Sequence, residues 1–114
     1  SGWQVPTDSE WTELTDLLGG GSVAGDAMKS TSGWSSGGNG SNSSGFTGLP
    51  GGLRSDNFIY GGYYNNFAIC YYWSSSVGSI SYAWSREMGR SYDDQVLRTS
   101  KNQYYGMSVR CLRD

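Results

Sequence analysis

The sequence predicts an α+β fold, with helices near the N-terminus and a mostly antiparallel sheet near the C-terminus. Apolar residues recur at helical spacing in residues 8–28, whereas residues 67–113 alternate as strands do. A stretch rich in glycine and serine, without periodicity, separates the two regions. Helices followed by strands favour packing of the helices on one side of the sheet. We expect one domain over residues 1–114.

The first predicted helix begins near Asp8. Thr7 and Glu10 have the spacing of a capping box, in which each side chain bonds the backbone N–H of the other residue. The apolar positions at helical spacing are Trp11, Leu14, Leu17 and Leu18. The glycine run at 19–21 is expected to end the helix.

Residues 22–30 predict a second, shorter helix with Ser22 as its N-cap. Helical spacing places four apolar side chains on one face: Val23, Ala24, Ala27 and Met28. Gly25 weakens this helix because glycine is a poor helix former.

Residues 31–52 have the Gly, Ser and Asn content of a flexible linker. Three large apolar residues, Trp34, Phe46 and Leu49, are nevertheless spaced through this stretch. We therefore favour a long ordered loop pinned by these side chains over a flexible linker.

Four runs near the C-terminus have the alternation of strands: 67–75, 80–88, 95–100 and 104–113. Residues 76–79, 89–94 and 101–103 are the predicted turns between them. In the last run, Tyr105, Met107, Val109 and Cys111 share one face, which we expect to belong to the core.

Composition and charge exclude several classes of function. A net charge of −2 without a basic run offers nothing to neutralise a nucleic acid backbone. No apolar run approaches the roughly 20 residues that span a bilayer, so we expect no membrane insertion. Histidine is absent, which removes the usual general base and most zinc sites, and we expect no cofactor. The Gly/Ser/Asn-rich composition favours a secreted protein, whose export signal was removed or lies upstream.

The two cysteines, Cys70 and Cys111, do not have the spacing of a metal site. A disulfide and two buried thiols are the alternatives that the sequence leaves open.

Three stretches together resemble a known family: GWQVPTDSEWTELTDLLGG at 2–20, YWSSS and YAWSREM within 72–88, and YYGMSVRCLRD at 104–114. They are similar to the Fibrobacter succinogenes major paralogous domain, a family frequent in surface and secreted proteins of Bacteroidetes. The resemblance covers nearly the whole chain. It implies a C-type-lectin-like fold of the formylglycine-generating-enzyme type, with two helices, a long loop region and a mostly antiparallel sheet.

Family members usually carry more sequence before the GW motif, including a strand and often a cysteine. We therefore expect this domain to lack the N-terminal segment of the full family domain. If that segment holds the usual partner of Cys111, Cys70 is unpaired or replaces that partner.

Calcium binding and catalysis are not expected from the resemblance. The Glu-Pro-Asn, Gln-Pro-Asp and Trp-Asn-Asp motifs that supply calcium ligands in true C-type lectins are missing. The acidic pair Asp93 and Asp94 lies in a predicted turn, where such pairs are more often solvated, so we predict no metal site. Formylglycine-generating enzymes use a reactive cysteine pair, and neither cysteine here has the basic surroundings that lower a thiol pKa.

The resemblance also implies a binding face, because one face of the sheet and its loops is commonly exposed for ligands in this fold. Some relatives are targets of diversity-generating retroelements, which vary residues of the C-terminal strands and loops. Tyrosine, serine and asparagine in such loops suit recognition, as in antibody paratopes. The candidate ligand-binding residues are Tyr71, Tyr82, Arg86, Arg90, Tyr92, Asp93, Asp94, Arg98 and Tyr104. For each residue taken singly, an ordinary surface side chain is the alternative.

The tryptophans of the family pattern are interpreted as framework: Trp3, Trp11, Trp73 and Trp84. Arg110 and Arg113 are expected to brace the sheet against acidic side chains rather than to contact a ligand. Period-two alternation places Tyr71 with Trp73, and Tyr82 with Trp84, so display of the two tyrosines requires a twist, bulge or strand end.

These observations lead to a first hypothesis of a non-enzymatic, extracellular or cell-surface recognition domain of a larger bacterial protein, binding a glycan or protein. The second hypothesis is a structural or assembly module that packs against neighbouring domains. A degenerate formylglycine-generating enzyme is a third, which the placement of the cysteines disfavours.

Overall fold

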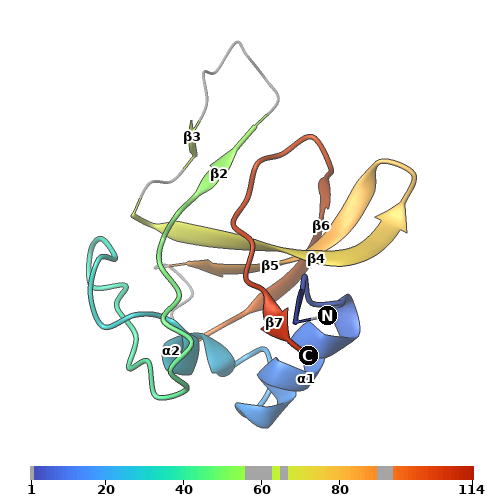
Figure 1. Cartoon of the computed structure of the whole chain (residues 1–114). Coiled ribbons are helices and arrows are strands. Elements are labelled where there is room, and N and C mark those ends of the chain that lie inside the picture. Colours follow the sequence, from blue (N-terminus) through green and yellow to red (C-terminus); the bar gives the residue numbers. More distant parts are fainter. Residues whose placement is uncertain (1, 56–62, 65–66, 90–93) are drawn as a thin grey trace.

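The computed structural model describes residues 2–55, 63–64, 67–89 and 94–114 (Figure 1). The elements follow one another as β1 (Trp3–Gln4), α1 (Asp8–Leu17), α2 (Ala24–Met28), β2 (Leu53–Arg54), β3 (Tyr63–Tyr64), β4 (Ile69–Ser79), β5 (Tyr82–Gly89), β6 (Leu97–Asn102) and β7 (Leu112–Arg113). Within the described ranges the chain is therefore α+β, with two short helices and antiparallel sheets, as the sequence predicts.

Helix α1 begins where the sequence places it. The capping box is complete: Thr7 Oγ1 accepts the Glu10 N–H at 3.2 Å, and the Thr7 N–H donates to Glu10 Oε2 at 2.8 Å. The glycine run ends the helix, since the Gly20 N–H bonds the Thr15 carbonyl at 2.8 Å from a left-handed conformation (φ 105°). Trp11 is buried, whereas Leu17 is exposed, so the buried stripe is narrower than predicted.

Helix α2 is shorter than predicted and depends on tertiary contacts. Its N-cap is Val23, which makes no side-chain cap, so the prediction of Ser22 is wrong. The Gly25 N–H, which has no partner inside the helix, donates to the Asp94 carbonyl at 2.8 Å. Ala24 and Met28 are buried, as predicted, but Val23 is exposed.

The main sheet has three antiparallel strands in the order β4-β5-β6. The predicted turn at 76–79 is wrong, because β4 continues to Ser79 and the chain reverses at residues 80–81. Two register shifts, between Trp73 and Val77 and between Val77 and Ser79, accommodate the extra residues as bulges. The glycine that suggested a turn, Gly78, instead lies against the Trp84 indole. Strand β6 likewise continues to Asn102, into the predicted turn at 101–103.

The last predicted strand, 104–113, is not a strand of this sheet. Only Ser108 pairs with β4, in parallel: its N–H donates to the Tyr71 carbonyl, and its carbonyl accepts from the Trp73 N–H, both at 3.0 Å. The chain then forms β7, which pairs with β1 beside α1 (Figure 1). The segment pairs first with β4 and then with β1, so every second residue along it does not point to the same side of one sheet. Val109 and Cys111 are exposed, and the predicted core face is therefore wrong.

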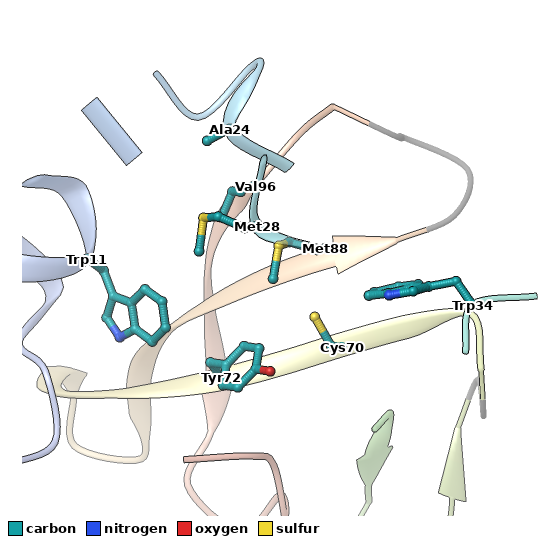
Figure 2. Packing of buried hydrophobic residues seen from close by; sticks show 8 residues of the cluster. All are labelled: Trp11, Ala24, Met28, Trp34, Cys70, Tyr72, Met88 and Val96. Atoms are coloured by element: carbon teal, nitrogen blue, oxygen red, sulfur yellow. The ribbon is translucent and has the colours of Figure 1, made fainter. Parts of the chain in front are cut away.

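The core lies between the helices and the β4–β5 pair, as Figure 2 shows. Its buried members are Trp11, Ala24, Met28, Trp34, Cys70, Tyr72, Met88 and Val96. Phe46, at the other end of the loop from Trp34, packs against this cluster. Residues 31–51, all described, form neither helix nor strand. Trp34 and Phe46 anchor this stretch, whereas Leu49 is exposed and does not.

The remaining framework predictions differ in outcome. Trp11 is buried, and Trp73 and Trp84 are half-buried, but Trp3 is largely exposed although it lies in β1. Both cysteines are free thiols, Cys70 in the core and Cys111 at the surface, so the structure contains neither the disulfide nor two buried thiols.

Candidate binding surface

One end of the main sheet carries the exposed residues that the sequence proposed for binding. The β4–β5 hairpin ends at Ile80, whose side chain is 98 % exposed, and Tyr82 follows at 45 %. Tyr104, beyond the end of β6, is 78 % exposed. We call these residues, with exposed Val77 on the bulged part of β4, the hairpin-tip surface. Val77 pairs with Ala83 and so lies on the opposite face of the sheet from Tyr82.

Main-chain and side-chain hydrogen bonds hold the hairpin tip against the end of β6. The Gln103 N–H donates to the Ser81 carbonyl at 2.9 Å, and the Gln103 side chain donates to the Tyr82 carbonyl at 3.4 Å. The Tyr104 N–H donates to Asn102 Oδ1 at 3.0 Å. The backbone that carries the exposed side chains is therefore fixed by the strands, while the side chains themselves face solvent.

Beside the tip, Arg98 stacks on a half-buried tryptophan. Its guanidinium carbon lies 3.5 Å from the centre of the Trp84 ring, and its Nη2 donates to Asp8 Oδ2 at 2.8 Å. Arg98 is half-exposed and keeps part of its polar edge in water. The hydrogen bonds from Arg98 and Arg86 lower the pKa of the Asp8 carboxyl below its ordinary value, against the opposing effect of partial burial.

Of the nine candidate residues from the sequence, four are exposed, two are buried and three lie outside the described residues. Tyr82 and Tyr104 lie at this end of the sheet, whereas Arg98 pairs with Arg86 four residues further along the strands. Exposed Asp94 lies next to α2, where its carbonyl accepts from Gly25. The candidates Arg90, Tyr92 and Asp93 lie outside the described residues.

The display of Tyr71 and Arg86 was predicted wrongly. Tyr71 is only 6 % exposed, because the segment around Ser108 runs along its edge of β4 and the Lys101 ammonium lies 5.5 Å from the centre of its ring. Arg86 is 2 % exposed and binds Asp8 of α1, so it is a structural residue.

Ile80 was not predicted at the tip because the predicted turn lies too early in the chain. A turn at 76–79 puts Ile80 at the start of a half-buried strand rather than at the tip. The serines on both sides of Ile80 were the available signal, since isolated apolar residues between polar ones are compatible with a loop.

A second feature is a pocket of about 200 Å³ between α1, the loop at Phe46 and the segment that precedes β7. Its lining is mostly apolar and includes Arg110 and Cys111. This site was not predicted because Arg110 and Cys111 were assigned to a strand, with Cys111 on its core face.

Neither a metal-ligand cluster nor a helix able to span a membrane occurs among the described residues. These residues contain no group of three or more Cys, Asp or Glu side chains placed to hold a metal ion. None of the helices there is both long and apolar enough to cross a bilayer.

Comparison with known proteins gives one match. The family model of the Fibrobacter succinogenes major domain matches residues 1–113. No curated protein and no solved structure matches the chain.

Proposed function

Because the chain belongs to the Fibrobacter succinogenes major domain family, we propose that it is a non-enzymatic recognition domain of a larger surface or secreted bacterial protein. Its ligand is a glycan or a protein, and its binding site is the hairpin-tip surface with Arg98 at the border. The observation that carries the proposal is the exposure of Tyr82 and Tyr104 on a backbone fixed by strands.

The chemistry of this surface suits recognition. Tyrosine offers a large amphipathic ring that loses little conformational entropy on binding, and Tyr82 and Tyr104 supply two such rings. The stacked Arg98 guanidinium adds hydrogen-bond donors to a ligand carboxylate or hydroxyl. Apolar Ile80 and Val77 extend the contact area, as they do in protein interfaces.

We also propose that the fold is C-type-lectin-like. The helices on one side of β4 and β5, the long stretch between α2 and β2, and the mainly antiparallel sheet with a parallel bridge from Tyr72 to Ser108 support it. The exposed residues of the hairpin tip do not belong to the core, so substitutions there leave the core packing unchanged. This is compatible with diversification of the region by a retroelement.

A non-enzymatic role is supported by the separation of the two thiols. Burial raises the pKa of Cys70 to about 12, so this thiol is not a nucleophile near neutral pH. Cys111 lies at the surface beside β7 rather than next to Cys70.

Screening of the domain against a glycan array and against a panel of extracellular proteins tests the proposal. The double variant Tyr82→Ala/Tyr104→Ala is expected to lose at least about tenfold in affinity for any ligand that the screen identifies. The reason is that tyrosines which become buried in an interface are among the residues that dominate its binding energy. The matched control is Phe67→Ala, since Phe67 is 64 % exposed and precedes the opposite end of β4. Equal losses in the two variants contradict the assignment of the site to the hairpin tip.

The second candidate function is a structural module whose hairpin tip packs against a neighbouring domain. The nearly complete exposure of Ile80 favours it, because aliphatic residues are typical of protein contacts rather than glycan sites. Exposure of Tyr82 and Tyr104 in the intact parent protein, before any ligand is added, excludes this alternative for the tip.

A further inference from the structure

The pocket beside α1 shares no residue with the hairpin-tip surface. It is lined by Pro6, Glu10, Trp11, Leu14, Phe46, Arg110, Cys111 and Leu112. Two aromatic rings and three aliphatic side chains supply its walls. The pocket is therefore an apolar hollow with one cationic side chain, one anionic side chain and one thiol.

The two charged side chains of the pocket, Glu10 and Arg110, both keep their charge but differ in whether the protein already bonds their polar atoms. Glu10 is engaged in the helix cap, since its Oε2 accepts from the Thr7 N–H at 2.8 Å and its Oε1 accepts from the Gln4 side chain at 3.0 Å. Arg110 lies with its guanidinium carbon 4.8 Å from the centre of the Phe46 ring. Within the described residues its guanidinium forms no ion pair and no hydrogen bond, so its donors are available to a ligand or to water.

The walls of the pocket are fixed by interactions that do not involve a ligand. The Trp11 ring packs 5.8 Å from both Phe46 and Tyr72, and its Nε1–H donates to the Trp73 carbonyl at 3.3 Å. Pairing of β7 with β1 holds Leu112 in place on the other side. Such preformed apolar sites bind without a large cost of ordering the protein.

We infer that this pocket binds a small amphipathic carboxylate. The apolar part of the ligand fills the space between Trp11, Leu14 and Phe46, and its carboxylate bonds the Arg110 guanidinium. A ligand carboxylate is favoured because the Glu10 oxygens already accept hydrogen bonds, whereas the Arg110 guanidinium has donors that the described residues do not use. The volume of about 200 Å³ is below the roughly 300 Å³ at which drug-sized sites begin, so the apolar part is limited to about one ring.

Phenylacetate is the probe, because it joins one ring to one carboxylate. Calorimetric or NMR titration is expected to show saturable binding with a dissociation constant of about 1 mM or lower, the range of a ligand this small. Benzyl alcohol keeps the ring without the charge, and acetate keeps the charge without the ring. Both are expected to bind at least about tenfold more weakly, since hydrogen bonds to a charged group and apolar burial each contribute that much.

The variant Arg110→Gln is expected to weaken phenylacetate binding by about tenfold or more. Its matched control is Arg113→Gln, which removes the same charge from an exposed residue of β7 that does not line the pocket. Near-ultraviolet circular dichroism of both variants verifies that the core is intact. Equal effects of the two substitutions show nonspecific attraction of an anion and overturn the inference.

Cys111 gives an independent measurement of occupancy, because it lines the pocket whereas Cys70 is buried in the core. A phenylacetate concentration that saturates the native protein is expected to slow alkylation of Cys111 by N-ethylmaleimide at least about threefold there and clearly less in Arg110→Gln, which it occupies only in part. Unchanged alkylation at saturation, or equal binding of benzyl alcohol and phenylacetate, contradicts the inference. Neither result bears on ligand recognition at the hairpin tip, because the two sites have no residue in common.

Discussion

Asp8 joins helix α1 to two strands of the sheet, and its replacement by asparagine is expected to destabilise the domain strongly. Asp8 Oδ1 accepts from Arg86 Nη1 at 2.8 Å, and Asp8 Oδ2 accepts from Arg98 Nη2 at 2.8 Å. The Arg86 side chain is 3 % exposed, so Asp8→Asn leaves a buried guanidinium without its counter-ion.

The magnitude follows from what Arg86 retains. Breaking a buried ion pair costs about 3–5 kcal/mol. Arg86 keeps three neutral acceptors, the carbonyls of Asp8 and Ser85 and the hydroxyl of Thr12, and these offset part of the loss. We therefore expect Asp8→Asn to lower the free energy of unfolding by about 2–3 kcal/mol. Arg98→Gln is expected to cost less than half as much, because water screens the half-exposed Arg98.

Urea unfolding followed by tryptophan fluorescence measures both changes, and its pH dependence gives a second test. The pKa of Asp8 in the folded state lies below its ordinary value of 3.8, which we take for the unfolded chain. The stabilisation is therefore present above about pH 4 and is lost as the pH falls through the lower, folded-state pKa. The difference in stability between wild type and Asp8→Asn should shrink over that interval. A loss below about 0.5 kcal/mol at pH 7, or a difference independent of acid pH, refutes the reasoning.

Three further outcomes are expected. Gly40→Ala should destabilise the domain by about 2 kcal/mol, measured by urea unfolding, because the added Cβ lies 2.7 Å from that of Lys29; an effect near zero contradicts this packing. Trp34→Phe should cost about 1–2 kcal/mol in the same assay, because it removes the buried Nε1–H that Ser30 Oγ and the Gly48 carbonyl share as acceptors; wild-type stability of the variant would exclude this contribution. Native alkylation should modify Cys111 alone, with Cys70 reacting only in denaturant, whereas native modification of Cys70 contradicts its burial.

Local signals in the sequence predicted the N-terminal part of the fold well. The capping box at Thr7 and the glycine run involve residues within a few positions of one another, so the start and end of α1 are encoded locally. Strands β4 to β6 were also predicted, because alternation identifies a half-buried strand without knowledge of its partners.

Features that depend on distant contacts were not predictable in this way. Glycine in a short polar run is a local signal for a turn, and Gly78 was interpreted in this way. In the structure Gly78 lies in the bulged part of β4, against the Trp84 ring. The burial of Tyr71 depends on a segment that returns more than thirty residues later, at Ser108. The pocket at Arg110 likewise joins both ends of the chain with the central loop, and no spacing within one run of sequence signals it.

Oxidative footprinting of the intact parent protein tests the central proposal most directly, because it measures whether the hairpin tip is free until a ligand binds. Hydroxyl radicals should modify Tyr82 and Tyr104 in the free protein, in keeping with their exposure here. Addition of the ligand that the screen retains should protect both residues and leave Phe67 unchanged. Protection of both tyrosines before any ligand is added, or no change on its addition, would contradict recognition at the hairpin tip.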